Sequence, residues 1–391
     1  MKLQCWAISC ALLAAGLQCT TANNTDVAAT VKEIQRTGAA VKFIELRLNA
    51  ASVQENDQYL CRQYTVPNGE RNGSFAFAFE ALEEAFGGHV HHMLVYGCDG
   101  RKVHDDNFDC SMGARPCLLE ASRPVHVYGW AKDAAGYAYP EHIGFPLGDL
   151  GSMVIQVHYA TPPSQLDRSG VRMYFTTTPE VAGISQYAGI VSAAATSNIV
   201  IPPHETKITI PTTCTWSSRE PFDVFAFRVH AHALAFGYPI TWELRRHTTA
   251  GTVSGGSWNY VAERDPALPQ IFLSLKKPVQ IRHGDSWRFN CSYNSLSRES
   301  MVRVGHSNQG EMCNLYLMSN STLGALRYAR ASMACVDAAG RALGTRPRDR
   351  NQRGAVPVGG EKHGGKLPLT AVRMMNRFGN GLARPWSSEN F

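Results

Sequence analysis

After its first 22 residues, the 391-residue chain has no run of about 18 apolar residues, the length that a membrane-spanning helix needs. The sequence therefore predicts no transmembrane segment. It also lacks a GxSxG nucleophile elbow, a GxxxxGKS/T phosphate loop, an HExxH motif and any CxxC pair. These absences argue against α/β-hydrolases, P-loop nucleotide enzymes, HExxH metalloproteases and CxxC zinc sites, because each class depends on its motif.

Outside the C-terminal end of the chain, positive and negative charges nearly cancel. Residues 339–391 carry ten Lys/Arg and three Asp/Glu, which leaves a net charge of −1 on residues 1–338 of a chain whose total is +6. A nearly neutral body offers no basic surface, so we expect no nucleic-acid partner. Residues 339–391 are rich in Gly, Pro and Arg and lack apolar periodicity, which predicts a basic, disordered tail.

Residues 1–22 have the pattern of a secretory signal peptide. Lys2 precedes a largely apolar stretch at 5–17, and small residues follow at 20–22. We therefore expect a protein of the secretory pathway, either secreted or held in the lumen of a secretory granule. Asn-X-Ser/Thr sequons predict a glycoprotein with four candidate sites: Asn23, Asn72, Asn290 and Asn320.

Eight of the eleven cysteines lie beyond the signal peptide. An even number of cysteines in a secreted chain indicates a disulfide framework, here of four bonds, but the count does not select a pairing. The cysteines fall into two groups of four: Cys61, Cys98, Cys110 and Cys117, then Cys214, Cys291, Cys313 and Cys335.

The body of the chain is predicted to be all-β. Short apolar runs alternate with Gly, Pro, Asn and Ser breaks, a pattern typical of sandwiches and jelly rolls. The expected strands are 74–79, 90–96, 153–159, 171–176, 207–210, 224–230, 240–244, 271–275, 286–291 and 314–318. Two segments, 79–86 and 322–334, are candidate helices. A break near 178–186 divides the body into two domains of ordinary size, 40–180 and 185–338.

Two histidine groups are candidate metal ligands. His230 and His232 lie on an expected strand, where residues i and i+2 project from one face and can bind one metal. A solvated strand face would give the same pattern. His91 and His92 are adjacent, so they can share a metal only if the backbone is distorted or different ring nitrogens are used. His158, alone on its strand, is more often a structural residue.

Met312 would change the choice of metal if it were a ligand. Methionine is normally core filler, but a thioether ligand favours Cu(I) over zinc or magnesium. A His/His/Met set together with a His/His/His set would therefore indicate redox copper. Spacing alone does not bring these distant residues together.

Four short motifs occur in order along the body of the chain: His91-His-Met-Leu-Val-Tyr-Gly-Cys98, Gln156-Val-His-Tyr159, Arg228-Val-His-Ala-His232 and Glu311-Met-Cys-Asn-Leu-Tyr316. With the eight cysteines, they resemble the copper type II, ascorbate-dependent monooxygenases over about residues 42–338. The family fold is two jelly-roll β-sandwich domains, each giving one copper site to an interdomain cleft. The resemblance also implies four disulfides: Cys61–Cys110, Cys98–Cys117, Cys214–Cys335 and Cys291–Cys313.

The resemblance implies two copper ions as cofactors, with ascorbate as electron donor and O2 as co-substrate. The electron-supplying copper would be held by three histidines of the first domain: His91, His92 and His158. The oxygen-binding copper would be held by three catalytic residues of the second domain: His230, His232 and Met312.

The motifs are most similar to the peptidylglycine-hydroxylating branch of the family. That branch hydroxylates the Cα of a C-terminal glycine, the first step in the amidation of neuropeptides and peptide hormones. Arg228 matches the arginine that holds the substrate carboxylate, and Asn314 and Tyr316 match its hydrogen-bonding partners. The resemblance therefore implies glycine-extended peptides as substrates, and a separate lyase that acts on the peptidyl-α-hydroxyglycine product.

Two alternatives remain open. The first is an amine β-hydroxylase of the dopamine or tyramine type, a sister branch whose members carry an additional N-terminal domain, for which residues before 42 leave no room. The second is a non-catalytic, copper-binding secreted sandwich protein. The intact six-ligand set argues against this second alternative, because a retired enzyme is free to lose ligands.

Overall fold

The computed structural model describes most of the body of the chain: residues 26–66, 73–83, 88–98, 106–110, 117, 124–131, 134–148, 150–195, 200–247, 256–303, 310–321 and 333–336, with the backbone alone for 321 and 333–336. The expected signal peptide 1–22, the tail 339–391 and the sequons at Asn23 and Asn72 lie outside these residues. No helix in the described segments is long and apolar enough to cross a membrane.

Two antiparallel sheets pack face to face in the first half. One has the strand order β5-β2-β9-β4-β6: β2 (Gln58–Thr65), β4 (Val90–Cys98), β5 (Phe108–Asp109), β6 (Val125–Ala131) and β9 (Ser152–Tyr159). Opposite lies part of a nine-stranded sheet: β1 (Val41–Arg47), β3 (Phe75–Leu82), β7 (Tyr137–Ala138), β8 (Ile143–Pro146) and β10 (Gly170–Thr176). Apolar side chains from both sheets, such as Phe79 and Met93, form the core between them.

The second half repeats this arrangement. Four strands complete the nine-stranded sheet: β11 (Gln186–Ala194), β14 (Phe222–His230), β17 (Leu273–Ile281) and β20 (Asn314–Ser321). They face a second five-stranded sheet: β13 (Ile208–Trp216), β15 (Ile240–Arg245), β16 (Asn259–Arg264), β18 (Ser286–Tyr293) and β21 (Met333–Val336). Three fully buried tryptophans, Trp216, Trp242 and Trp287, fill the core. A small pair, β12 (Val200–Ile201) and β19 (Val302–Arg303), lies apart.

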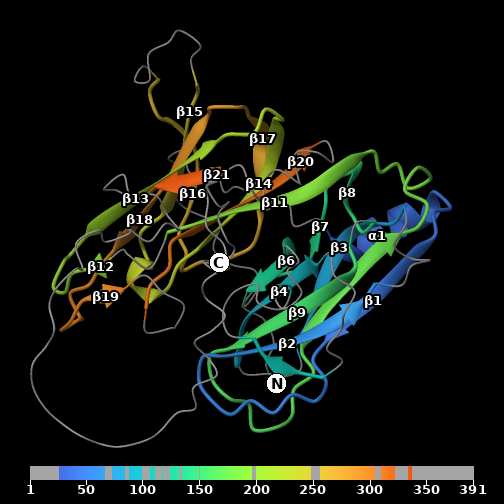
Figure 1. Cartoon of the computed structure of the whole chain (residues 1–391), viewed down its shortest axis with the longest axis horizontal. Coiled ribbons are helices and arrows are strands. Elements are labelled where there is room, and N and C mark those ends of the chain that lie inside the picture. The colour runs from blue at the N-terminus through green and yellow to red at the C-terminus, as the bar shows by residue number, and fades with distance from the viewer. Residues whose placement is uncertain are drawn as a thin grey trace, which may run out of the picture.

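One sheet therefore runs through both halves. β8 and β11 pair in parallel, Ile143 with Gln186 and Gly144 with Tyr187, and Figure 1 shows β11 crossing from the second half toward β8. The first core also contains residues of the second half, including Phe225. The two halves are consequently joined by backbone hydrogen bonds and by shared apolar packing.

The all-β sandwich fold expected from the sequence is confirmed, and each of the ten expected strands overlaps an observed one. β13 shows why: from Ile210 to Trp216 its residues alternate between buried and partly buried positions, as on a sheet with one face on the core. β9 is buried at every position, because β2 and β4 flank it and both of its faces are covered.

The candidate helix at 79–86 was wrong over residues 79–83, and residues 84–86 lie outside the described segments. Residues 79–82 belong to β3, which pairs with β10 on one side and with β7 and β8 on the other. These ladders outweigh the weak helical preference of the glutamates. The second candidate, 322–334, ends in β21, and its residues 322–332 lie outside the described segments.

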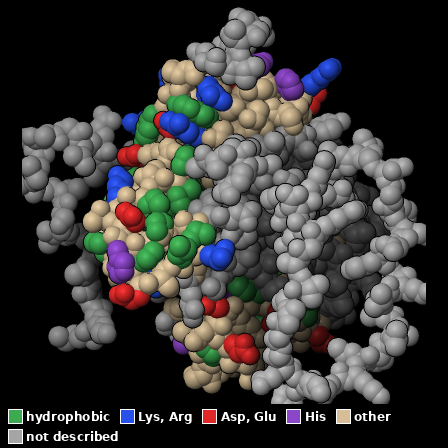
Figure 2. Space-filling view, turned by 60° about the vertical axis from the view of Figure 1, so that its left-hand side comes forward, with side chains coloured by type: hydrophobic (Ala, Val, Ile, Leu, Met, Phe, Trp, Pro, Cys, Tyr) green, Lys and Arg blue, Asp and Glu red, His purple; other side chains and the backbone are tan. Residues whose placement is uncertain are grey.

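One helix that was not predicted from the sequence, α1 (Val27–Arg36), precedes the first strand. Asp26 caps it by accepting hydrogen bonds from the backbone N–H groups of Ala28 and Ala29. Val27 joins a small apolar cluster with Phe77 of β3. On the face displayed in Figure 2, acidic and basic side chains are interspersed, in keeping with the nearly neutral charge of this part of the chain.

Candidate functional site

The first histidine set lies where β4 pairs with β9. The register between these strands shifts between Val90 and His92. Val90 pairs with Tyr159 and His92 with His158, so β4 has one extra residue, His91, at this point. This bulge rotates His91 toward the side that His92 and His158 occupy. The three Nδ1 atoms lie 3.2, 3.3 and 3.4 Å apart. The backbone distortion that adjacent histidines require for a shared metal is therefore present.

These three imidazoles fit a metal ion. Nitrogens that each bind one ion at about 2 Å lie about 3 Å from one another, the separation seen here. Burial, and next the neighbouring His91, lower the pKa of His158 to about 3. Burial also lowers the pKa of His92 well below its ordinary value. Both rings are neutral at physiological pH, which is the form that binds metal.

The second set follows the end of β14. His230 is the last residue of that strand, and the short 3-10 helix η1 (Ala233–Ala235) begins after His232. The Nδ1–H group of His230 donates to the side-chain oxygen of Gln270, and that of His232 donates to the carbonyl oxygen of Gly310 at 2.9 Å. Both rings therefore present Nε2 as the lone-pair nitrogen. Their ring centroids are 5.4 Å apart.

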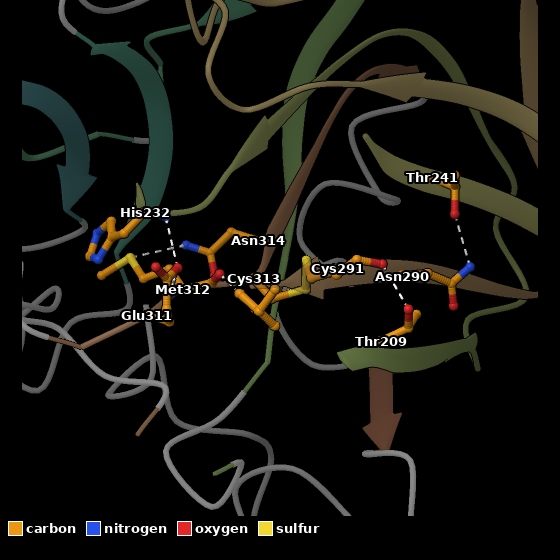
Figure 3. The surroundings of a disulfide bond; sticks show 11 residues. Thr209, His232, Thr241, Asn290, Cys291, Glu311, Met312, Cys313 and Asn314 are labelled. Atoms are coloured by element: carbon orange, nitrogen blue, oxygen red, sulfur yellow. Dashed lines mark hydrogen bonds between the residues drawn. A yellow bond between two sulfur atoms is a disulfide. The ribbon is translucent and has the colours of Figure 1, made fainter. Parts of the chain in front are cut away.

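Met312 lies beside this second pair, immediately before β20. Figure 3 shows its thioether next to the ring of His232, and the side-chain N–H of Asn314 contacts the sulfur at 3.7 Å. Cys313 is bonded to Cys291 of β18, which ties the Met312 segment to the opposite sheet. The arrangement offers two imidazole nitrogens and one soft sulfur, a donor set suited to Cu(I).

Glu311 fixes these ligands relative to one another. Its buried carboxylate accepts hydrogen bonds from the backbone N–H groups of His232 at 3.0 Å, Leu234 at 2.7 Å and Met312 at 3.3 Å (Figure 3). Burial raises the pKa of Glu311 to about 7, against the opposing effect of these hydrogen bonds. Glu311 lies within one of the four motifs, but the sequence alone predicted no role for it.

The two histidine sets meet at the junction of the halves. The ring centroid of His91 lies 6.0 Å from that of His230 and 6.0 Å from that of His232. The ring of His92 is likewise 6.0 Å from that of His230. Ligand sets that are more than 65 residues apart in the sequence thus form one cluster of five imidazoles.

The three expected substrate residues are also neighbours. In the β14–β20 register, Arg228 lies opposite Tyr316, and His230 lies opposite Asn314. The guanidinium carbon of Arg228 is 5.4 Å from the centre of the Tyr316 ring. The Asn314 side-chain N–H donates to the Tyr316 hydroxyl at 3.2 Å.

Arg228 is a buried cation without an anionic partner. It is 3% exposed, its Nε has no hydrogen-bond acceptor, and no ion pair of Arg228 occurs among the described residues. Burial lowers its pKa. An unpaired buried guanidinium is costly, so this side chain is suited to receive an anion from outside the chain.

Residues of the first half also lie beside Arg228 and Tyr316. A Cβ on Gly129 of β6 would lie 2.8 Å from Nη1 of Arg228, so the glycine makes room for the guanidinium. The ring of His126, also on β6, meets that of Tyr316 edge-on at 5.6 Å, and its Nδ1 lies 3.4 Å from the Ser192 hydroxyl. Gly129 and His126 were not predicted from the sequence, because nothing local distinguishes them from other strand residues.

Three of the four disulfides implied by the resemblance are present: Cys61–Cys110, Cys98–Cys117 and Cys291–Cys313. For the fourth, the β13–β21 register sets Cys335 directly opposite Cys214, and Cys214 is disulfide-bonded.

Comparison with known proteins identifies the family. Residues 44–166 match the copper type II ascorbate-dependent monooxygenase N-terminal domain, and residues 186–336 match the C-terminal domain of the same family. The chain belongs to the copper type II, ascorbate-dependent monooxygenase family. Membership in a copper- and ascorbate-dependent family makes the cluster of His91, His92 and His158 a candidate copper site.

The relatives come from two branches. Peptidyl-glycine alpha-amidating monooxygenase A of Xenopus laevis is 30% identical over 75% of this chain and 30% of its own length, and peptidylglycine alpha-amidating monooxygenase of Rattus norvegicus is 29% identical over 75% and 28%. Rattus norvegicus dopamine beta-hydroxylase is 30% identical over 58% of this chain and 37% of its own length. The chain thus spans about a third of the length of these relatives. Among solved structures, PNGase F of Flavobacterium meningosepticum aligns over 72% of this chain and 96% of its own, with a TM-score of 0.35 and 10% identity.

Proposed function

We propose that this protein is a peptidylglycine α-hydroxylating monooxygenase, with domains at 40–180 and 185–338. Arg228 carries the proposal, because its buried guanidinium lacks an anionic partner among the described residues. A peptide ending in glycine brings a carboxylate, which can pair with a guanidinium through two charge-assisted hydrogen bonds. A phenylethylamine brings a cation instead, which Arg228 would repel.

The position of Arg228 also selects the carbon that reacts. Arg228 and His230 are residues i and i+2 of β14 and project from one face, about 6.6 Å apart along the strand. A carboxylate held by Arg228 therefore places the adjacent carbon, the Cα of the terminal residue, toward the set of His230, His232 and Met312. Asn314 and Tyr316 lie beside this path and would orient the carboxylate.

The two ligand sets have different proposed tasks. His91, His92 and His158 would present Nδ1 to the electron-supplying copper, whereas His230 and His232 would present Nε2, together with Met312 sulfur, to the second copper. When bound, two coppers reduced by ascorbate supply the electrons that activate O2. One oxygen atom enters the Cα–H bond, and the other leaves as water after taking up two electrons and two protons.

The proposed setting is the secretory pathway, either the granule lumen or the extracellular space. Three buried disulfides agree with an oxidising compartment. The product, a peptidyl-α-hydroxyglycine, would be the substrate of a lyase that releases the peptide amide and glyoxylate.

Mass-spectrometric turnover tests the proposal. The purified full chain, supplied with copper, ascorbate and O2, is given a short peptide ending in glycine, the same peptide as its C-terminal amide, and tyramine. We expect one added oxygen on the peptide acid alone. Hydroxylation of tyramine alone would move the chain to the amine branch, and no product with two coppers bound would favour a non-catalytic copper protein.

A further inference from the structure

Asp57 lies beside the first histidine set, in the turn that leads into β2. Its Oδ1 is 3.4 Å from Nε2 of His158, and its side chain is 25% exposed. Its backbone has φ of +60°, in the left-handed region, which aspartate adopts more readily than most residues because its short polar side chain can form local hydrogen bonds.

The ring of His158 is fixed in plane and direction. Tyr59 stacks on it with 4.0 Å between ring centroids and an interplanar angle of 4°. Nδ1 faces His91 and His92 at 3.2 and 3.4 Å, so Nε2 points the opposite way, toward Asp57. Nε2 is buried and forms no hydrogen bond of good geometry.

The charge of Asp57 decides which nitrogen of His158 holds the proton. A carboxylate oxygen facing Nε2 attracts an N–H group and repels a lone pair, so the proton resides on Nε2. Nδ1 then presents its lone pair to the same point as His91 and His92. Asp57 also acts on the second set, since its charge opposes the burial that lowers the pKa of His232.

We propose that Asp57 is a positioning residue for the first copper, one that holds His158 as the Nε2–H tautomer and favours Cu(II) over Cu(I) at this site by its negative charge. The part that concerns copper rests on the proposed function, whereas the tautomer of His158 does not. A fixed anion stabilises the more highly charged ion more strongly, so loss of Asp57 should favour Cu(I).

Two substitutions separate charge from backbone effects. Asp57→Asn and Asp57→Gly both remove the charge, and both tolerate a positive φ, so neither strains the turn. Asp106→Asn, which removes an exposed acid in the same half, is the matched control. The full-length apoprotein is examined by ¹⁵N–¹H correlation of the histidine rings. The copper-loaded protein is titrated electrochemically and followed by EPR, in a His232→Ala background that isolates the first set.

In the wild type and in Asp106→Asn, we expect His158 as the Nε2–H tautomer. In both Asp57 variants, the ratio of this tautomer to the Nδ1–H form should fall about tenfold. The preference of the first set for Cu(II) over Cu(I) should also fall about tenfold, which raises its one-electron potential by about 59 mV.

An unchanged tautomer and an unchanged potential in both Asp57 variants would overturn the inference. A change in Asp57→Asn that is absent from Asp57→Gly would also overturn it, because the effect would then belong to asparagine and not to the lost charge. Failure of the wild type to bind copper at the first set would refute the proposed function instead, and the apoprotein spectra would still decide the role of Asp57.

Discussion

Replacing Arg228 by methionine should weaken peptide binding and stabilise the free protein. The guanidinium and the substrate carboxylate can form two charge-assisted hydrogen bonds, and their loss should cost about 3 kcal/mol, or about 150-fold in affinity. In the free protein, Arg228 is 3% exposed and has no ion pair among the described residues. Its removal should therefore raise the free energy of unfolding by about 1–2 kcal/mol, and Tm by a few degrees.

Both effects can be measured against matched controls. Calorimetric titration compares a peptide ending in glycine with the same peptide as its amide, so that contacts with the rest of the peptide cancel. Arg288→Met is the control for stability, because Arg288 forms an ion pair with Glu243 and the same substitution there should lower Tm. If Arg228→Met weakened the acid and the amide equally, or lowered Tm as Arg288→Met does, the assignment of Arg228 as an anion site would be refuted.

Met312→Ile should abolish turnover, because the second copper would lose its soft ligand, while circular dichroism should show an unchanged fold. Undiminished turnover would contradict the assignment of Met312 as a ligand. Glu311→Gln should lower the free energy of unfolding by about 1–3 kcal/mol in urea titrations, because it weakens hydrogen bonds that include the one from the His232 N–H. Equal urea midpoints for the variant and the wild type would contradict this. Burial lowers the pKa of His126 and His158 to about 3. Below pH 6.5 the unfolded chain therefore binds more protons than the folded chain does. The free energy of unfolding of the apoprotein should fall, as the pH falls, by about 1.4 kcal/mol per pH unit for each of these histidines. Equal urea midpoints at pH 7.5 and pH 5 would exclude this.

Local pattern predicted ten of the 21 strands in the described residues, but not how the two halves join. Alternating and continuous apolar runs identified β13 and β9, because burial on one face or on both leaves a direct trace in the sequence. The parallel contact of β8 with β11 involves two residue pairs more than 40 positions apart, and neither segment carries a signal for it. The same limitation explains the error at 79–82, where pairing with β10 determined the conformation.

The candidate site was likewise predictable only in part from the sequence. The i, i+2 spacing of His230 and His232 predicted that the two rings lie close together, and their centroids are 5.4 Å apart, although β14 ends at His230 and His232 lies beyond the strand. His91 and His92 required a bulge that only the β4–β9 register reveals. Asp57 could not be predicted from the sequence at all. An acid in a polar turn is ordinary, and its proximity to His158 depends on the pairing of β2 with β9.

Several features that cost the fold stability lie where the two halves meet. Arg228 is buried without an anionic partner among the described residues, and Asp57 holds a positive φ. The rings of five histidines lie close together, and burial lowers the pKa of four of them: His92, His158, His230 and His232. None of these is needed to close a sandwich, since the apolar cores on either side are complete without them. A carboxylate would relieve the unpaired guanidinium, and metal ions would relieve the crowded histidines. Because each ligand would bind residues that border the junction, occupancy should stabilise this region, and a fold selected for stability alone would have replaced it with apolar residues.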